Sequence, residues 1–149
     1  MPTQWAILGR VAVSFVIGFV IGWEREVRGA SAGDRTFALV TMASAAVVAV
    51  YGRIAPNTVA GVMTGVGFIG GGLLIQSSAG MVKGITTAAT IWIAAAIGVV
   101  AGSGHLLLAL LIGALALVTL EFRYIPGLRA LDARRHIQKM TDDSAPPGM

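Results

Sequence analysis

Apolar residues dominate five stretches of the chain, each separated from the next by a short polar or glycine-rich segment. The stretches cover residues 5–23, 36–51, 58–75, 86–100 and 106–120. Trp5 and Trp23 bracket the first stretch, whose length of about 27 Å as a helix is close to the thickness of the hydrocarbon core. The pattern therefore predicts an all-α fold, an integral membrane bundle of five transmembrane helices.

Composition agrees with this pattern and limits the domain organisation. Of 149 residues, 56% are hydrophobic and only 12% are charged, which is far from the average of soluble domains. The first apolar stretch lacks a preceding basic cluster and a small-residue cleavage site, so we interpret it as a permanent span. We expect residues 1–125 to form one transmembrane domain, and residues 126–149 to be a basic cytoplasmic stub with a disordered tail.

Basic residues predict the orientation, because Lys and Arg accumulate on the cytoplasmic side of membrane proteins. An odd number of spans places the termini on opposite sides. With the C-terminus inside, nine of the 11 Lys and Arg residues are cytoplasmic, and Arg10 and Arg53 are outside. We therefore expect the N-terminus outside and the C-terminus in the cytoplasm. Arg10 either snorkels to the outer headgroups or faces the bundle.

The segment between the first two stretches holds a third of all charged residues. Its polar positions are Glu24, Arg25, Glu26, Arg28, Asp34, Arg35 and Thr36. Glu24 and Arg28 have the i, i+4 spacing that forms ion pairs if the first helix continues past Trp23. Arg25 and Glu26 would then point elsewhere and need partners such as Asp34, Lys83 or Glu121. The segment predicts either an interlocked polar network or solvated surface pairs worth about 0 to 1 kcal/mol each.

Several kinds of chemistry are disfavoured. The chain has no cysteine, its two histidines lie far apart in sequence, and we find no Ser, His and Asp arrangement, so we expect neither an enzyme nor a metal or cofactor site. Glu24, Glu26 and Asp34 offer oxygen ligands for Mg²⁺, but three arginines in the same segment argue against such a site. The net charge of +4 suggests anionic membrane lipids as partners, and no nucleic acid.

The third stretch is unusually rich in glycine. Its six glycines are Gly61, Gly65, Gly67, Gly70, Gly71 and Gly72. One interpretation is close helix packing through GxxxG pairs, repeated at Gly18 and Gly22 and at Gly98 and Gly102, and extending to a homo-oligomer, with a dimer favoured. The alternative is a helix break at residues 70–72, whose freed carbonyls would line an ion path.

The fourth stretch opens with hydroxyl side chains and a deep tryptophan, namely Thr86, Thr87, Thr90 and Trp92. Thr86 and Thr90 share one helix face. The free amides at this helix start would suit an anion or a carboxylate. The alternative is that the hydroxyls satisfy the helix backbone. Trp92 lies about 9 Å below the helix start and needs a hydrogen-bond partner if it is buried.

A weak internal similarity suggests duplication. Residues 18–22 resemble residues 67–71, and residues 31–33 recur as residues 78–80. Each copy is followed by a basic residue, Arg35 or Lys83, and then by threonine. The spacing predicts a parallel repeat of two hairpins plus a fifth helix, and chance similarity in a chain rich in Gly and Ala is the alternative.

Three ordered motifs resemble the MgtC/SapB family of bacterial membrane proteins over about residues 6–122. The first joins GWERE at residues 22–26 to GDRT at residues 33–36. The second runs from RIA at residues 53–55 to GVGFIGGG at residues 65–72, and the third is KGITTAATIW at residues 83–92, with AAIG at residues 95–98 and GSG at residues 102–104. The resemblance implies a five-span protein of the bacterial inner membrane. It assigns importance to Glu24, Glu26, Arg28, Arg35, Thr36, Gly67, Gly70, Thr86, Thr87 and Trp92.

The resemblance also implies physiological roles, although the family has no agreed biochemical activity. Its best-known members are tied to growth in low magnesium, survival inside host cells and restraint of the proton-driven ATP synthase, and other members are linked to acid stress. The best-known members end in a sizeable cytoplasmic domain, where this sequence has only the basic stub after Arg123. Two hypotheses follow. One is a non-enzymatic regulator of a membrane-protein partner such as the ATP synthase, and the other is a small ion transporter or channel whose path follows the third span and the start of the fourth.

Overall fold

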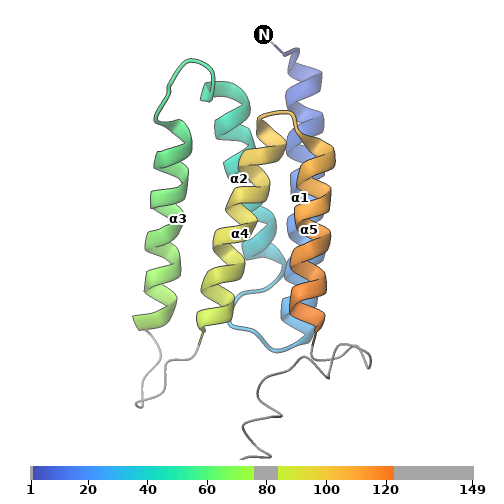
Figure 1. The fold of residues 1–149 in the computed structure, drawn as a ribbon, viewed down its shortest axis with the longest axis vertical. Coiled ribbons are helices and arrows are strands. Elements are labelled where there is room, and N and C mark those ends of the chain that lie inside the picture. Colours follow the sequence, from blue (N-terminus) through green and yellow to red (C-terminus); the bar gives the residue numbers. More distant parts are fainter. Residues whose placement is uncertain (1, 76–83, 123–149) are drawn as a thin grey trace, which may run out of the picture. The chain divides into compact units, whose positions relative to one another are not determined.

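The computed structural model describes residues 2–75 and 84–122, which form α-helices joined by turns, without strands. The helices are α1 (Gln4–Val27), α2 (Asp34–Tyr51), α3 (Thr58–Ile75), α4 (Ile85–Gly102) and α5 (Leu106–Glu121) (Figure 1). The chain divides into one unit of residues 1–116 and another of residues 117–149, so the boundary falls within α5. The predicted all-α class and the five helix positions are confirmed.

Three of the described helices, α1, α2 and α4, are long and apolar enough to cross a membrane. The helix α5 is also apolar but shorter, with 16 residues. With 18 residues, α3 is about 27 Å long. The predicted stub at residues 126–149 and the link with Lys83 lie outside the described residues, so the predicted domain division stays a prediction.

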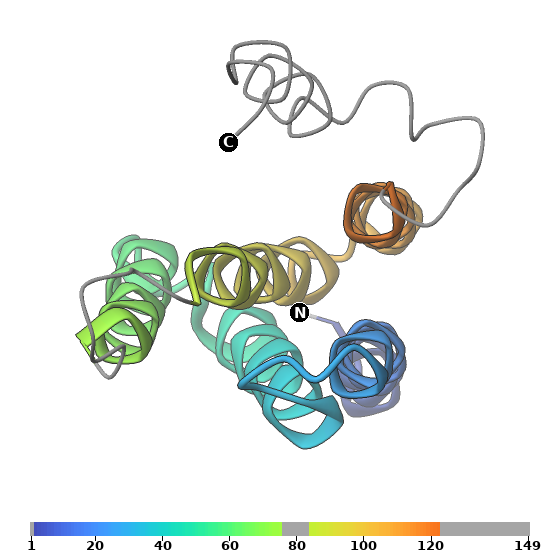
Figure 2. The ribbon, with the colours of Figure 1, turned by 90° about the horizontal axis from the view of Figure 1, so that it is seen from below.

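The helices α2 and α4 lie side by side, with α1 flanking α2 and α3 flanking α4 (Figure 2). Consecutive helices run in opposite directions (Figure 1). The helix α4 also contacts α1, and its apolar side chains Ile91, Ala94, Ala95 and Ile97 are almost completely buried. The first unit therefore has its core around α4 and the facing side of α2.

Glycines allow α1 to approach α2 closely. A Cβ atom at Gly22 would lie 2.5 Å from the Asp34 Cα, and one at Gly18 would collide with the Thr41 hydroxyl. In lipid, helix association depends on van der Waals contact, because the surrounding acyl chains are as apolar as the side chains. The predicted packing role of the Gly18 and Gly22 pair is therefore confirmed.

The helix α4 uses the same device on another side of α2. A Cβ atom at Gly98 would lie 2.7 Å from the Ser44 Cβ, and one at Gly102 would lie 2.5 Å from the Ala45 carbonyl oxygen. Thr41 of α2 thus has its hydroxyl against Gly18 and its carbonyl against Gly98. The hydroxyl itself is satisfied within α2, since it donates to the Phe37 and Ala38 carbonyls at 3.0 Å.

The glycines of α3 behave differently. A Cβ atom at Gly61, Gly65, Gly67, Gly71 or Gly72 would meet nothing within 4 Å, whereas one at Gly70 would be in ordinary contact with Ala88 of α4 at 3.7 Å. The helix is continuous to Ile75, so the alternative of a break at residues 70–72 is wrong. The i to i−4 hydrogen bonds of a continuous helix occupy the carbonyls that a break would have freed.

The suggested duplication does not extend to packing. The pair Gly18 and Gly22 is closely packed against α2, but its counterpart Gly67 and Gly71 faces open space. The residues compared in the second loop, 78–80, lie outside the described residues. The parallel repeat therefore stays a prediction that these glycine contacts do not support.

Candidate polar site at the end of α1

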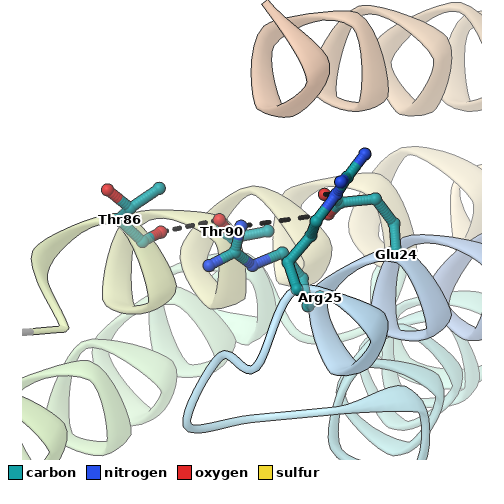
Figure 3. Close-up of polar contacts among 5 residues, drawn as sticks. Glu24, Arg25, Thr86 and Thr90 are labelled. Carbon is teal, nitrogen blue, oxygen red and sulfur yellow. Dashed lines mark hydrogen bonds and ion pairs between the residues drawn. The ribbon is translucent and has the colours of Figure 1, made fainter. Parts of the chain in front are cut away.

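The helix α1 continues one turn beyond Trp23 and carries Glu24, Arg25 and Glu26 in that turn. It ends at Val27. The C-cap residue is Arg28, whose backbone N–H donates to the Glu24 carbonyl, and the chain reverses at Gly29 with φ of +68°. A positive φ is easily adopted by glycine and costs other residues strain. Figure 3 draws the Glu24 and Arg25 side chains together with Thr86 and Thr90 from the first turns of α4.

One carboxylate holds two guanidinium groups. The Glu24 Oε1 atom lies 3.7 Å from Arg28 Nε, and its Oε2 atom lies 3.9 Å from Arg25 Nη1. The predicted i, i+4 pair is confirmed. The expectation that Arg25 points elsewhere is wrong, because its long side chain folds back onto the carboxylate beside it. We call Glu24, Arg25 and Arg28 the buried ion cluster.

Two side chains of the buried ion cluster, Glu24 and Arg25, are largely shielded from solvent, and the third, Arg28, belongs to an exposed residue. The exposed fractions of its side chains are 11% for Glu24, 14% for Arg25 and 32% for Arg28. The Arg25 Nε atom is buried and has no hydrogen-bond partner among the described residues. Charges with this burial interact more strongly than charges in water and cost more to leave unpaired. The alternative of fully solvated surface pairs therefore does not describe Glu24 and Arg25.

Glu26 is not part of this cluster and instead forms a hydrogen bond at the start of α2. Its Oε2 atom accepts a hydrogen bond of 3.2 Å from the backbone N–H of Asp34, the first residue of α2. The N-cap position is occupied by Gly33, which has no side chain to make this bond. A Cβ atom at Gly33 would collide with the Glu26 carboxylate. Glu26 of α1 therefore caps α2 across the turn.

The remaining predicted members lie around a cleft of about 360 Å³ at this turn, lined in part by Glu26, Asp34, Arg35 and Thr36. The Asp34 Oδ1 atom accepts from the Arg35 backbone N–H at 2.6 Å. The side chain of Arg35 is exposed, and Thr36 is partly buried. The polar segment thus divides into the buried ion cluster and the Glu26 cap.

At the start of α4, the plainer expectation is confirmed for the Thr90 hydroxyl. Thr90 Oγ1 donates to the Thr86 carbonyl at 2.6 Å (Figure 3). Thr87 and Thr90 are buried, and Thr86 is exposed. Trp92 is 50% exposed and so needs no buried partner for its indole. An anion at this helix start stays a prediction.

Arg10 faces the bundle at the opposite end of α1. Its Nη1 atom donates to the Gly102 carbonyl, the last residue of α4, at 3.0 Å. This hydrogen bond supports the interpretation that Arg10 faces the bundle, and snorkelling to the outer headgroups stays a prediction. The position of Arg10 inside Trp5 was its sequence signal, but the partner lies 92 residues away and no local pattern indicates it.

The described carboxylates do not suit Mg²⁺. Glu24 is held by two arginines and Glu26 by a backbone amide. No group of three or more His, Asp or Glu side chains with metal-binding geometry occurs in residues 2–75 and 84–122. A small divalent cation needs several free oxygen ligands, which this arrangement does not supply.

A glycine-packed bundle of apolar helices, with ionic groups near the helix ends, defines a multi-pass α-helical membrane protein. A model of the MgtC family matches residues 11–125. The chain belongs to the MgtC family.

The chain is also similar to several curated relatives. The chain is 43% identical over 113 residues to Protein SrpB of Synechococcus elongatus, covering 64% of this chain and 62% of the relative. It is 37% identical over 142 residues to the Putative magnesium transporter YhiD of Escherichia coli, covering 87% and 66%. It is 39% identical over 99 residues to Protein MgtC of Brucella abortus, covering 63% and 41%. The matched regions thus span less than two thirds of the relatives' lengths, and no solved structure matches the chain.

Proposed function

We propose that this protein is a non-enzymatic regulator in the bacterial inner membrane that contributes to magnesium homeostasis by binding another membrane protein. The observation that carries the proposal is the buried ion cluster, in which Glu24 is held by Arg25 and Arg28. Its charges are engaged with one another, which suits a rigid docking end of the bundle. Family membership and the relative named a putative magnesium transporter support the link to magnesium.

The distribution of ionisable groups favours a regulator over a conducting pore. Residues 36–51, 58–75, 85–102 and 106–120 contain no Asp, Glu, Lys, Arg or His. Ion pathways usually place such groups inside the membrane, where they are rare otherwise. The continuous α3 also offers no freed carbonyls at Gly70 to Gly72.

The end of the bundle that carries Glu26 and Arg35 offers exposed charges of both signs for a partner. Mixed charges give orientation and specificity more than affinity. By the positive-inside rule we place this end in the cytoplasm, with the N-terminus outside. The family resemblance makes the proton-driven ATP synthase the partner to test first.

The test uses inverted membrane vesicles, with ATP-driven proton pumping as the readout. We expect the full chain to lower pumping, and Arg28→Gln to weaken this effect because it opens the buried ion cluster at its most exposed member. His105→Gln, an exposed polar change in the turn between α4 and α5, is the control and should act like the unaltered chain. Equal pumping with and without the protein would remove the ATP synthase as partner.

A transporter is the second candidate, favoured by the E. coli relative named Putative magnesium transporter YhiD, whose match covers 87% of this chain. Purified protein in liposomes with an enclosed magnesium indicator separates the two functions. The regulator proposal expects no Mg²⁺ entry above protein-free liposomes. Selective entry that is lost in Thr86→Val would overturn it.

We further propose that a second copy binds along α3. A shallow apolar groove of about 310 Å³ lies between α2 and α3, and Gly61 and Gly65 line it. Close backbone approach through such glycines stabilises helix pairs in lipid. The groove lies open in one copy of the chain, and a dimer would cover it.

A further inference from the structure

A second polar feature lies at the end of the bundle opposite the buried ion cluster. A cavity of about 520 Å³ opens between the first turns of α1 and the last turns of α2 and α4. Arg10 from α1 and Arg53 from the turn between α2 and α3 line it, with Gly52, Val59, Gly102 and Ser103 among the other lining residues. Its volume is in the range of about 300 to 1,000 Å³ that small-molecule sites have.

The cavity is cationic. Its lining residues include two guanidinium groups and no carboxylate. Within described residues 2–75 and 84–116, the acidic side chains are Glu24, Glu26 and Asp34, and all three lie at the opposite helix ends. Two positive charges without a counter-ion in one cavity favour an anionic occupant.

The partial negative charges of the helix ends offset only part of the positive charge in the cavity. The carbonyl ends of α2 and α4 carry partial negative charge at this cavity. Arg10 neutralises the partial negative charge at the end of α4, because its Nη1 atom donates to the Gly102 carbonyl. A guanidinium has five N–H donors, so one carbonyl leaves most of its capacity free. The Arg53 side chain makes no hydrogen bond or ion pair with the described residues.

Arg10 is also held in place. A Cβ atom at Gly104 would lie 2.9 Å from Arg10 Nη2, so the turn between α4 and α5 passes close to the guanidinium. Gly104 has φ of +97°, which suits a residue without a side chain. One guanidinium is thus fixed by two segments, while the exposed Arg53 can move to meet a ligand.

Exposed aromatic residues mark the level of the cavity in the membrane. Trp5 is 82% exposed and lies five residues, or about 7.5 Å, before Arg10 along α1. Tyr51 is 53% exposed at the end of α2, next to Gly52 of the cavity wall. Exposed Trp and Tyr side chains concentrate at the headgroup level of a bilayer. These two residues indicate that the cavity lies near the headgroup level.

We propose that this cavity binds a phosphate group, held by the guanidinium groups of Arg10 and Arg53. An anionic phospholipid headgroup or free phosphate could supply this group, and their chemistry at the arginines is the same. Guanidinium groups form short, charge-assisted hydrogen bonds to phosphate oxygens. This site is separate from the proposed regulatory function and does not depend on it.

The test is native mass spectrometry of the full chain in detergent, titrated with phosphatidylglycerol, with phosphatidylcholine of the same acyl chains, or with inorganic phosphate. We expect phosphatidylglycerol to bind more tightly than phosphatidylcholine. Arg53→Gln should weaken its binding about tenfold, the ratio that one charged hydrogen bond provides. Arg53→Lys should recover part of the loss.

The controls distinguish a lipid headgroup from free phosphate as the ligand, and they distinguish a loss of binding from a loss of folding. Arg35→Gln removes one exposed positive charge at the other end and should bind like the unaltered chain. Arg10→Gln also removes the bond to Gly102, so its thermal unfolding is measured beside its binding, and Arg53→Gln carries the test. Displacement of the lipid by millimolar phosphate would assign the site to the free anion. Three results together would overturn the proposal. The two lipids would bind the unaltered chain equally, Arg53→Gln would bind them as the unaltered chain does, and inorganic phosphate would not bind.

Discussion

Glu24 is the residue on which the polar end of α1 depends, because it is the counter-ion of a guanidinium that is only 14% exposed. Removing one partner of a buried ion pair leaves an uncompensated charge, and this costs more than the pair itself contributes. Glu24 therefore stabilises the fold mainly by neutralising charges that would otherwise have no counter-ion.

We expect Glu24→Gln to lower the free energy of unfolding by about 2 to 4 kcal/mol, since it leaves Arg25 buried without its carboxylate. The double variant Glu24→Gln with Arg25→Gln should lose less than the sum of the two single variants. Unfolding by denaturant in detergent micelles measures all four proteins. Strict additivity would show that the two side chains do not interact.

Glu26 offers a separate prediction at the start of α2. Glu26→Gln keeps an oxygen that can accept from the Asp34 N–H, whereas Glu26→Leu removes it. We expect Glu26→Leu to cost about 1 kcal/mol of stability, as the loss of other N-caps does, and Glu26→Gln to cost less. The same denaturant titration measures both, and a larger loss for Glu26→Gln would contradict the cap.

Among the elements, α3 and α4 show that one sequence pattern can have two outcomes. Small residues at i, i+4 spacing occur in both helices. In α4 they fit against the backbone of α2, and in α3 they leave the space beside the helix open. The difference arises from the partner surface, which the spacing alone does not contain.

We expect Gly98→Leu to prevent folding, because its side chain would collide with Thr41 and Ser44. Gly65→Leu should leave the monomer folded, since a Cβ atom there meets nothing within 4 Å. If α3 is the surface for a second copy, Gly65→Leu also converts dimers to monomers. Light scattering of the purified protein measures the mass, and an unchanged dimer would place self-association elsewhere.

The elements were largely predictable from sequence, and the polar contacts only in part. Apolar runs and interfacial Trp residues placed the helices, since length and hydropathy dominate in lipid. The Glu24 and Arg28 pair followed from helical spacing. The bonds from Arg10 to Gly102 and from Asp34 to Glu26 join separate elements, so they depend on tertiary packing that no local pattern encodes.

On the scale of the whole molecule, the described charges of residues 2–116 gather at the helix ends, with the acidic groups at one end and two isolated arginines at the other. The predicted orientation, in contrast, depends on Lys and Arg alone, with nine of 11 expected on the cytoplasmic side and Arg10 and Arg53 outside. A chain without cysteine is well suited to test it, because any introduced thiol is unique.

We expect Thr3→Cys to react with a membrane-impermeant maleimide in intact cells, and Arg35→Cys to react only after the membrane is opened. Both positions are exposed in the structure. Labelling is measured by the mass shift of the purified protein. The reverse labelling pattern would place the buried ion cluster outside the cell and exclude a cytoplasmic partner for it.

The cap that Glu26 of α1 provides to α2 has a consequence for biosynthesis. Of the three long helices, α2 is the least apolar, and its N-cap residue, Gly33, has no side chain to cap it. Its first turn also rests in the recess that Gly22 leaves in α1. Newly made α2 thus gains its stable place in the bilayer when α1 is already there, so the two helices should leave the translocon as one hairpin.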